Sequence, residues 1–165
     1  MPRRTRKAVL AVHLTVSIGW VGAVLAYLGL GIASANSEQE STISGAWIAM
    51  EVIGWWVIVP LALASLLTGV VMAVGTTWGL VRYYWVLVSF ALTTFATSIL
   101  LLHMPDVSTV ADQARTARGS ELQALGGDLF HAGFGLAVLL AVLVLNVVKP
   151  PGMTRYGWRR QGNAR

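Results

Sequence analysis

The stretch LFHAGFGLAVLLAVLVLNVV, residues 129–148, contains no Asp, Glu, Lys or Arg. As a helix it would rise about 30 Å, which is the thickness of the hydrocarbon core of a bilayer. Three further uncharged apolar stretches, 8–33, 52–75 and 83–104, are long enough to do the same. The sequence therefore predicts an all-α integral membrane protein. We expect one transmembrane domain, a four-helix bundle with antiparallel, up-down-up-down helices.

Charged residues divide unequally between the two sides of such a bundle. Four crossings place all 7 acidic residues on one side. Most of the 12 basic residues fall on the other side, in the N-terminal segment, at Arg82 and in the basic tail 149–165. Because positive charge is retained in the cytoplasm, both termini are predicted to be cytoplasmic. The expected location is the inner (plasma) membrane, as a multi-pass protein.

The overall composition excludes several classes of protein. The chain is 56% hydrophobic and 12% charged, about half the charged fraction of a soluble domain. The basic residues flank the predicted spans, so the expected partner is the lipid bilayer and not nucleic acid. The absence of cysteine excludes disulfides and cysteine-ligated iron–sulfur clusters.

Two features are expected to interrupt the helices. Pro60 lies in the middle of the second predicted span and should kink it. Residues 105–127 are predicted to form a long outer loop that begins at Pro105 and contains a short amphipathic segment.

All 3 histidines lie within or at the ends of predicted spans, where ionisable groups usually have a function. His103 ends the third span and His131 begins the fourth, so both are expected at one level in the outer leaflet. His13 lies near the inner side, about 20 Å away. Two imidazoles at one level can ligate haem iron in a helical bundle. We therefore predict His103 and His131 as axial metal ligands of a non-covalent haem b.

Three further residues are predicted to belong to that cofactor site. Gly135, one turn after His131, would leave room for a flat macrocycle. Arg115 and Arg118 are the only cations predicted on the outer side, where they would pair with haem propionates. In the simplest alternative no cofactor is bound, and His103 caps helix carbonyls while His131 bonds Asp128 or Glu51.

Copper is the alternative cofactor. Met50 and Met104 are predicted near His103 at the outer boundary, and thioethers with imidazole suit Cu(I). However, His103 and Met104 are adjacent in a helix and diverge by about 100°.

The first span carries two distinct faces. Small residues form one of them and predict a membrane-packing seam, at Ala11, Thr15, Gly19, Gly22, Ala26, Gly29 and Ala33. The opposite face carries His13, Ser17, Trp20 and Tyr27 and is also expected to contact protein or cofactor. The small-residue seam could alternatively receive a membrane protein partner or a second copy of the chain.

The run HLTVSIGWVG, residues 13–22, resembles the first helix of copper-resistance D-type membrane proteins. It is similar, more distantly, to protoporphyrinogen oxidases of the HemJ type. An uncharacterised bacterial family of small four-helix membrane proteins resembles nearly the whole chain, at 60–65, 84–87, 103–105, 131–133 and 149–157. The named relatives imply a first-helix histidine tied to haem b or metal handling, and His13, Trp20 and Gly22 match their pattern. Ser89 stands where such relatives carry a basic residue.

Three functions follow as expectations. The first is a haem b protein with a redox or electron-transfer role. The second is a non-catalytic membrane subunit of a larger complex. The third is a protein that handles copper or another small solute. The sequence shows no hydrolase or phosphate-loop motif, and it leaves open whether the protein is an enzyme.

Overall fold

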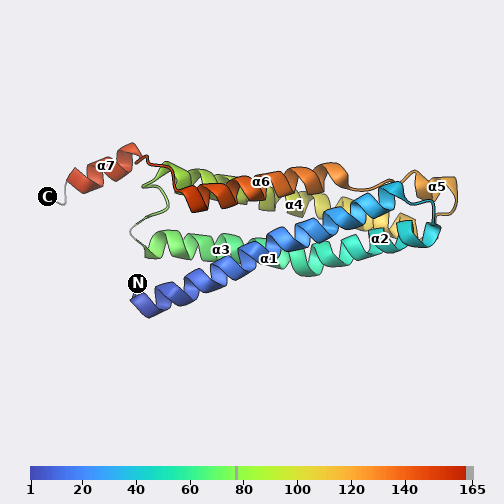
Figure 1. The fold of residues 1–165 in the computed structure, drawn as a ribbon, viewed down its shortest axis with the longest axis horizontal. Coiled ribbons are helices and arrows are strands. Elements are labelled where there is room, and N and C mark those ends of the chain that lie inside the picture. Colours follow the sequence, from blue (N-terminus) through green and yellow to red (C-terminus); the bar gives the residue numbers. More distant parts are fainter. Residues whose placement is uncertain (77, 163–165) are drawn as a thin grey trace.

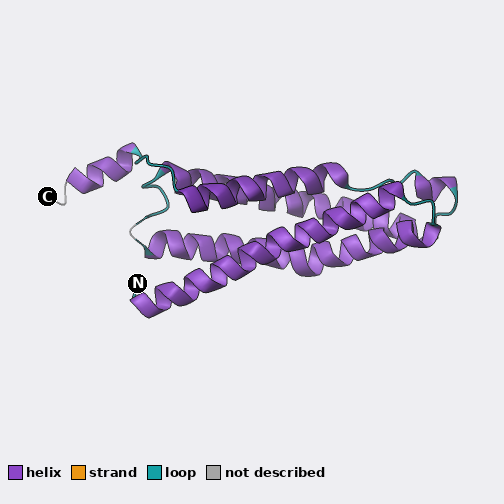
Figure 2. Ribbon diagram, in the orientation of Figure 1, coloured by secondary structure: helices purple, strands orange, loops and turns teal. Residues whose placement is uncertain are grey.

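The computed structural model describes residues 1–76 and 78–162. Within those ranges the regular structure is helical, apart from one isolated bridge between Tyr83 and Met153 (Figure 2). The elements are α1 (Arg3–Asn36), α2 (Glu40–Ile53), η1 (Gly54–Ile58), α3 (Val59–Gly75), α4 (Tyr84–Thr116), α5 (Ser120–Gln123), α6 (Leu129–Val148) and α7 (Arg155–Gly162).

In the described part of the chain, four helices are long and apolar enough to cross a membrane: α1, the continuous helix Glu40–Gly75, α4 and α6. The predicted all-helical, multi-pass membrane protein is confirmed at this level. Helix α1 packs against α2, α3 and α6, and α4 packs against the same three helices. The start of α1 and helix α7 lie at one end of the bundle, here called the basic end, and α5 lies at the other, the acidic end (Figure 1).

Helix α6 has the predicted bounds, but the other three spans extend further toward the acidic end than predicted. Helix α2 begins at Glu40 and not at residue 52, and α4 continues through Pro105 to Thr116. The prediction of a long loop over 105–127 is therefore wrong. Proline removes one helical hydrogen bond, but packing against α2 offsets this loss, because Val107, Ala111 and Ala114 on the extension of α4 are buried.

The disturbance expected at Pro60 takes the form of a π-helical turn just before it, η1. Such turns insert a residue and widen the helix locally. Gly54 begins this turn and faces the fully buried Met104 of α4. A Cβ on Gly54 would lie 2.7 Å from Met104 Sδ, so glycine leaves the space that the thioether fills.

The small-residue seam of α1 does not pack within the chain. Gly22, Ala26 and Gly29 are exposed, and Gly19 alone lies near a neighbour, Leu61. The buried side chains come from the opposite, polar-aromatic face, at Trp20, Val24, Tyr27 and Ser34. The seam prediction is therefore wrong for this chain's own packing. The larger side chains provide more contact area, and Tyr27 and Ser34 also form hydrogen bonds across the bundle.

The segment after α6 is attached to the loop before α4 at the basic end. Thr154 donates through its hydroxyl to the carbonyl of Val81 (2.6 Å) and through its amide to the carbonyl of Arg82 (2.9 Å). Tyr84 donates its amide to the carbonyl of Gly152 (3.3 Å). These bonds position α7. The end of the predicted basic tail, 163–165, lies outside the described residues.

Thr154→Val should release this segment without changing the bundle. A buried hydrogen bond contributes about 1 kcal/mol, and valine keeps the shape of threonine but leaves the Val81 carbonyl unpaired. We expect trypsin to cleave after Arg155 and Arg159 faster in this variant than in the wild type in detergent. Gel electrophoresis and mass spectrometry measure the cleavage. Thr116→Val, at an exposed position of the acidic end, is the matched control. Equal cleavage rates in both variants would contradict the assigned role of Thr154.

Candidate functional site

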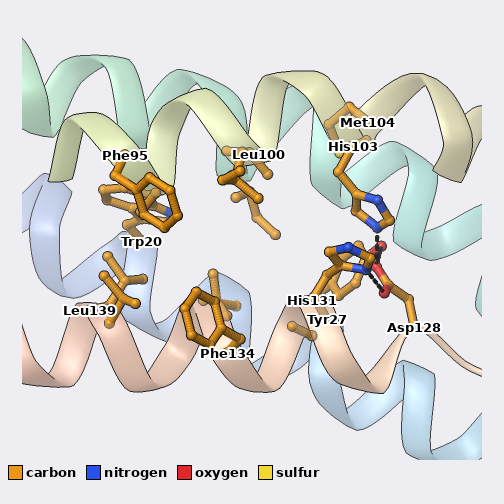
Figure 3. A pocket seen from close by; sticks show the side chains of 17 residues that line it. Trp20, Tyr27, Phe95, Leu100, His103, Met104, Asp128, His131, Phe134 and Leu139 are labelled. Carbon is orange, nitrogen blue, oxygen red and sulfur yellow. Dashed lines mark hydrogen bonds and ion pairs between the residues drawn. The ribbon is translucent and has the colours of Figure 1, made fainter. Parts of the chain in front are cut away.

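His103, Asp128 and His131 meet near the acidic end of the bundle (Figure 3). His103 lies on α4, Asp128 directly precedes α6, and His131 is in the first turn of α6. His103 Nε2 donates to Asp128 Oδ2 (2.7 Å), and His131 Nδ1 donates to Asp128 Oδ1 (3.2 Å). The predicted meeting of the two histidines is thus observed, and the carboxylate between them is the added element.

Asp128 connects three parts of the chain. Tyr27 of α1 donates its hydroxyl to Asp128 Oδ2 (2.9 Å), so one carboxylate receives bonds from α1, α4 and α6. The Asp128 side chain is 7% exposed. Burial raises the pKa of this carboxyl, but the hydrogen bonds from His103 and Tyr27 together lower it by more than burial raises it. The pKa of Asp128 therefore lies below its ordinary value. Asp128 is therefore ionised at neutral pH.

A close approach of backbones holds Asp128 in place. Gly31 of α1 lies against the loop before α6, and a Cβ on Gly127 would lie 2.9 Å from the Gly31 carbonyl carbon. Ser34 Oγ donates to the carbonyl of Gly126 (2.6 Å), and Trp47 Nε1 donates to the same carbonyl (3.2 Å). The loop is consequently fixed against both α1 and α2.

The two imidazole rings are stacked, with 3.8 Å between their centroids and 23° between their planes. A haem held by both histidines needs iron between one nitrogen of each ring, with the macrocycle separating the rings. The stack leaves no such space, and each ring directs one nitrogen at Asp128. The residues as arranged therefore do not fit a haem sandwiched between His103 and His131.

An apolar cavity adjoins the cluster on the side away from the acidic end. Its volume is about 80 Å³, and it is open on one side. Besides the cluster itself, its lining includes Trp20, Phe95, Leu100, Phe134, Gly135 and Leu139 (Figure 3). Gly135 lines the cavity, and no neighbouring atom lies within 4 Å of the position that its Cβ would take.

The two arginines predicted to assist the site lie elsewhere. Arg115 donates to Glu51 (2.7 Å) and pairs with Asp112, and it is about 18 Å of helical rise beyond His103. Arg118 donates to the carbonyl of Ala117 (2.7 Å). The structure does not bring either guanidinium to the histidine pair, because Pro105 does not end α4 and the helix carries both residues away.

His13 is separate from the pair, as predicted. It lies on α1 and faces α3, where its Nδ1 forms a hydrogen bond with Thr68 Oγ1 (2.9 Å). Ser17 and Ser65 form a second bond on the same interface (2.8 Å). His13 therefore belongs to a polar contact between two helices.

The methionines proposed for copper are both buried. Met50 is fully enclosed, and Met104 turns its thioether toward Gly54. The sulfur of Met104 therefore serves packing against η1.

Sequence reasoning missed two members of the site. The sequence predicts Asp128 only as an alternative partner of His131, and it places Tyr27 only on a face of the first span. The spacing of Asp128 and His131, three residues apart at a helix start, is the local signal that was available. The contact with Tyr27 spans 101 residues, and no local pattern predicts it.

The fold and the site define a class, a multi-pass membrane protein with a His–Asp–His cluster beside an apolar cavity. No protein-family model matches the chain, and no curated protein or solved structure matches it either. The resemblances noted in the sequence stay predictions.

Proposed function

We propose that the chain is an integral membrane protein that binds a redox-active divalent transition metal ion through His103, Asp128 and His131. The observation that carries the proposal is that one potential ligand atom from each residue lies within 4.8 Å of the others. No other group of this kind occurs within residues 1–76 and 78–162.

The geometry needs little change to accept an ion. Ligands bound at about 2.0–2.2 Å lie roughly 3.0–3.5 Å apart, and the His103–Asp128 and His131–Asp128 distances are 2.7 and 3.2 Å. The carboxylate is ionised, and the Tyr27 hydroxyl fixes its orientation. An ion would replace the two histidine–aspartate hydrogen bonds and keep the tyrosine bond.

The donor set favours iron among the divalent ions. Two imidazoles and one carboxylate with open positions form the pattern of non-haem Fe(II), while Zn²⁺ and Cu²⁺ also accept imidazole. Three protein ligands leave at least one coordination position open, which distinguishes a reactive site from a closed structural one. We therefore assign the proposed redox role to this cluster.

The proposed orientation follows from charge. The four spans would be antiparallel, with the basic end and both termini in the cytoplasm of a cell with an inner membrane. Helix α6 has 20 residues, enough to cross the hydrocarbon once. Asp128 and His131, at its start, would then lie at the outer boundary of the bilayer.

A haem b protein is the second candidate, and the apolar cavity beside Gly135 favours it. In that case a single histidine would serve as axial ligand and the ring stack would have to open. An absorption spectrum separates the two candidates, because bound haem gives a Soret band and a non-haem ion does not.

The test of the proposed function is the metal content of the purified protein. After growth with added iron, we expect about one metal ion per chain and no Soret band. His103→Ala and His131→Ala should each lower metal affinity at least 10-fold, measured by elemental analysis and competition with a chromogenic chelator. His13→Ala is the matched control and should retain the ion, because His13 bonds Thr68 instead. If the double variant of His103 and His131 still bound one metal ion per chain, the assignment of these residues as ligands would be overturned. If the purified protein contained copper and no iron, the site would be assigned to copper.

A further inference from the structure

The cavity beside the cluster has a polar end and an apolar body. Its polar end consists of His103, Asp128 and His131, and its body is formed by aromatic and aliphatic side chains of α1, α4 and α6. Figure 3 shows Phe134 between His131 and Leu139, and Phe95 with Trp20 at the far end. From His131 to Leu139 the cavity follows about 12 Å of helix.

The open side of the cavity faces the surroundings of the spans. Phe95 is 48% exposed and Phe134 is 49% exposed, although both line the cavity. Both residues lie on helices apolar enough to cross a membrane, so in a bilayer this side would open on acyl chains. A ligand can therefore enter from the lipid phase without crossing water.

Each imidazole keeps one nitrogen for a ligand. His103 Nδ1 and His131 Nε2 have no hydrogen-bond partner among the residues that the structure describes. The His131 side chain is 47% exposed and that of His103 is 19% exposed. A polar group at the head of an otherwise apolar molecule would find these nitrogens, or the open position of the proposed ion, at the end of the cavity.

We propose that this cavity binds a lipid-soluble quinone, with its ring carbonyl or hydroxyl at the histidine end and its apolar tail toward Trp20 and Leu139. A flat ring suits the aromatic lining, because aromatic groups favour offset stacking and edge contacts. A plain acyl chain would leave the polar end unused. The inference rests on the proposed function for the ion, because the quinone would be the ligand that reaches the open metal position.

Volume decides how such a ligand sits. Pockets that enclose small molecules measure about 300–1,000 Å³, whereas the volume of this cavity is only about 80 Å³. The head group would therefore be held by protein while the tail stays in contact with lipid. This arrangement predicts binding of short-tailed as well as long-tailed quinones.

Two glycines of α6 provide a matched test. Gly135 lines the cavity and Gly133 is absent from its lining, and no atom lies within 4 Å of a Cβ built at either. Gly135→Leu should fill the cavity, whereas Gly133→Leu adds the same side chain to the same helix outside it. The probe is a short-tailed benzoquinone, added to protein in detergent and followed by isothermal titration calorimetry. The corresponding alkylbenzene, which lacks the carbonyl oxygens, is the control ligand.

We expect the benzoquinone to bind the wild-type protein. Its affinity for Gly135→Leu should be at least 10-fold lower, and its affinity for Gly133→Leu should equal that for the wild type. Metal content, measured on the same samples, should be equal in all three. Metal without quinone binding would overturn this inference and leave the proposed function standing, whereas absence of both would overturn the proposed function as well. Equal affinity for the alkylbenzene would show an acyl-chain groove and also overturn the inference.

Discussion

Asp128→Asn is expected to lower metal affinity at least 10-fold and to destabilise the fold by about 2–4 kcal/mol. The carboxylate of Asp128 accepts hydrogen bonds from Tyr27, His103 and His131. An amide of the same shape has one acceptor oxygen, and its NH₂ group would face a donor. Each buried group left unpaired costs about 1–3 kcal/mol, and the exposed His131 contributes least. Elemental analysis and thermal unfolding in detergent measure the two effects.

Asp106→Asn is the matched control for this variant. Asp106 lies three residues after His103 on the same helix, but it is exposed and absent from the cluster. We expect its stability to change by less than about 0.5 kcal/mol and its metal content to stay the same. If both variants behaved alike, Asp128 would not be the centre of the site.

Gly127→Ala is expected to have the largest structural effect, a loss of at least about 3 kcal/mol of stability. The added Cβ would overlap the carbonyl oxygen of Gly31 and lie 3.2 Å from the Cβ of Ala35. Backbone atoms of a packed helix cannot move aside as a flexible side chain can, so overpacking here is costly. The loop would have to move away from α1 and carry Asp128 with it. Loss of metal should therefore accompany the lower unfolding temperature.

Gly133→Ala is the comparison variant, and we expect it to increase the stability of the protein. Its Cβ would meet no atom within 4 Å, and alanine within a helix is favoured over glycine by about 0.5–1 kcal/mol. A stable, fully metallated Gly127→Ala protein would show that the close approach of Gly31 and Gly127 does not position the site.

Local physics accounts for the features that the sequence predicted correctly. The hydropathy of the segment 129–148 depends only on the side chains of that segment. The predicted span therefore coincides with the observed helix α6. The shared level of His103 and His131 follows from the ends of two uncharged stretches and a constant helical rise. The separation of His13 follows from the same rise.

Interactions between distant segments account for the errors. Pro105 is a helix breaker by its own chemistry, but packing between α2 and α4 carries the helix to Thr116. That extension removes Arg115 from the site and pairs it with Glu51. The small residues of α1 indicated a packing face, whereas the chain buries Trp20 and Tyr27 instead.

The sequence by itself determined that the chain is a helical membrane protein, and which histidines stand at one height, because hydropathy and helical rise are properties of each segment alone. Only the tertiary structure decided that a carboxylate lies between those histidines, that Tyr27 holds it, and that an apolar cavity adjoins them. These features depend on which faces of α1, α4 and α6 meet. That choice is made by contacts summed over segments as many as 101 residues apart.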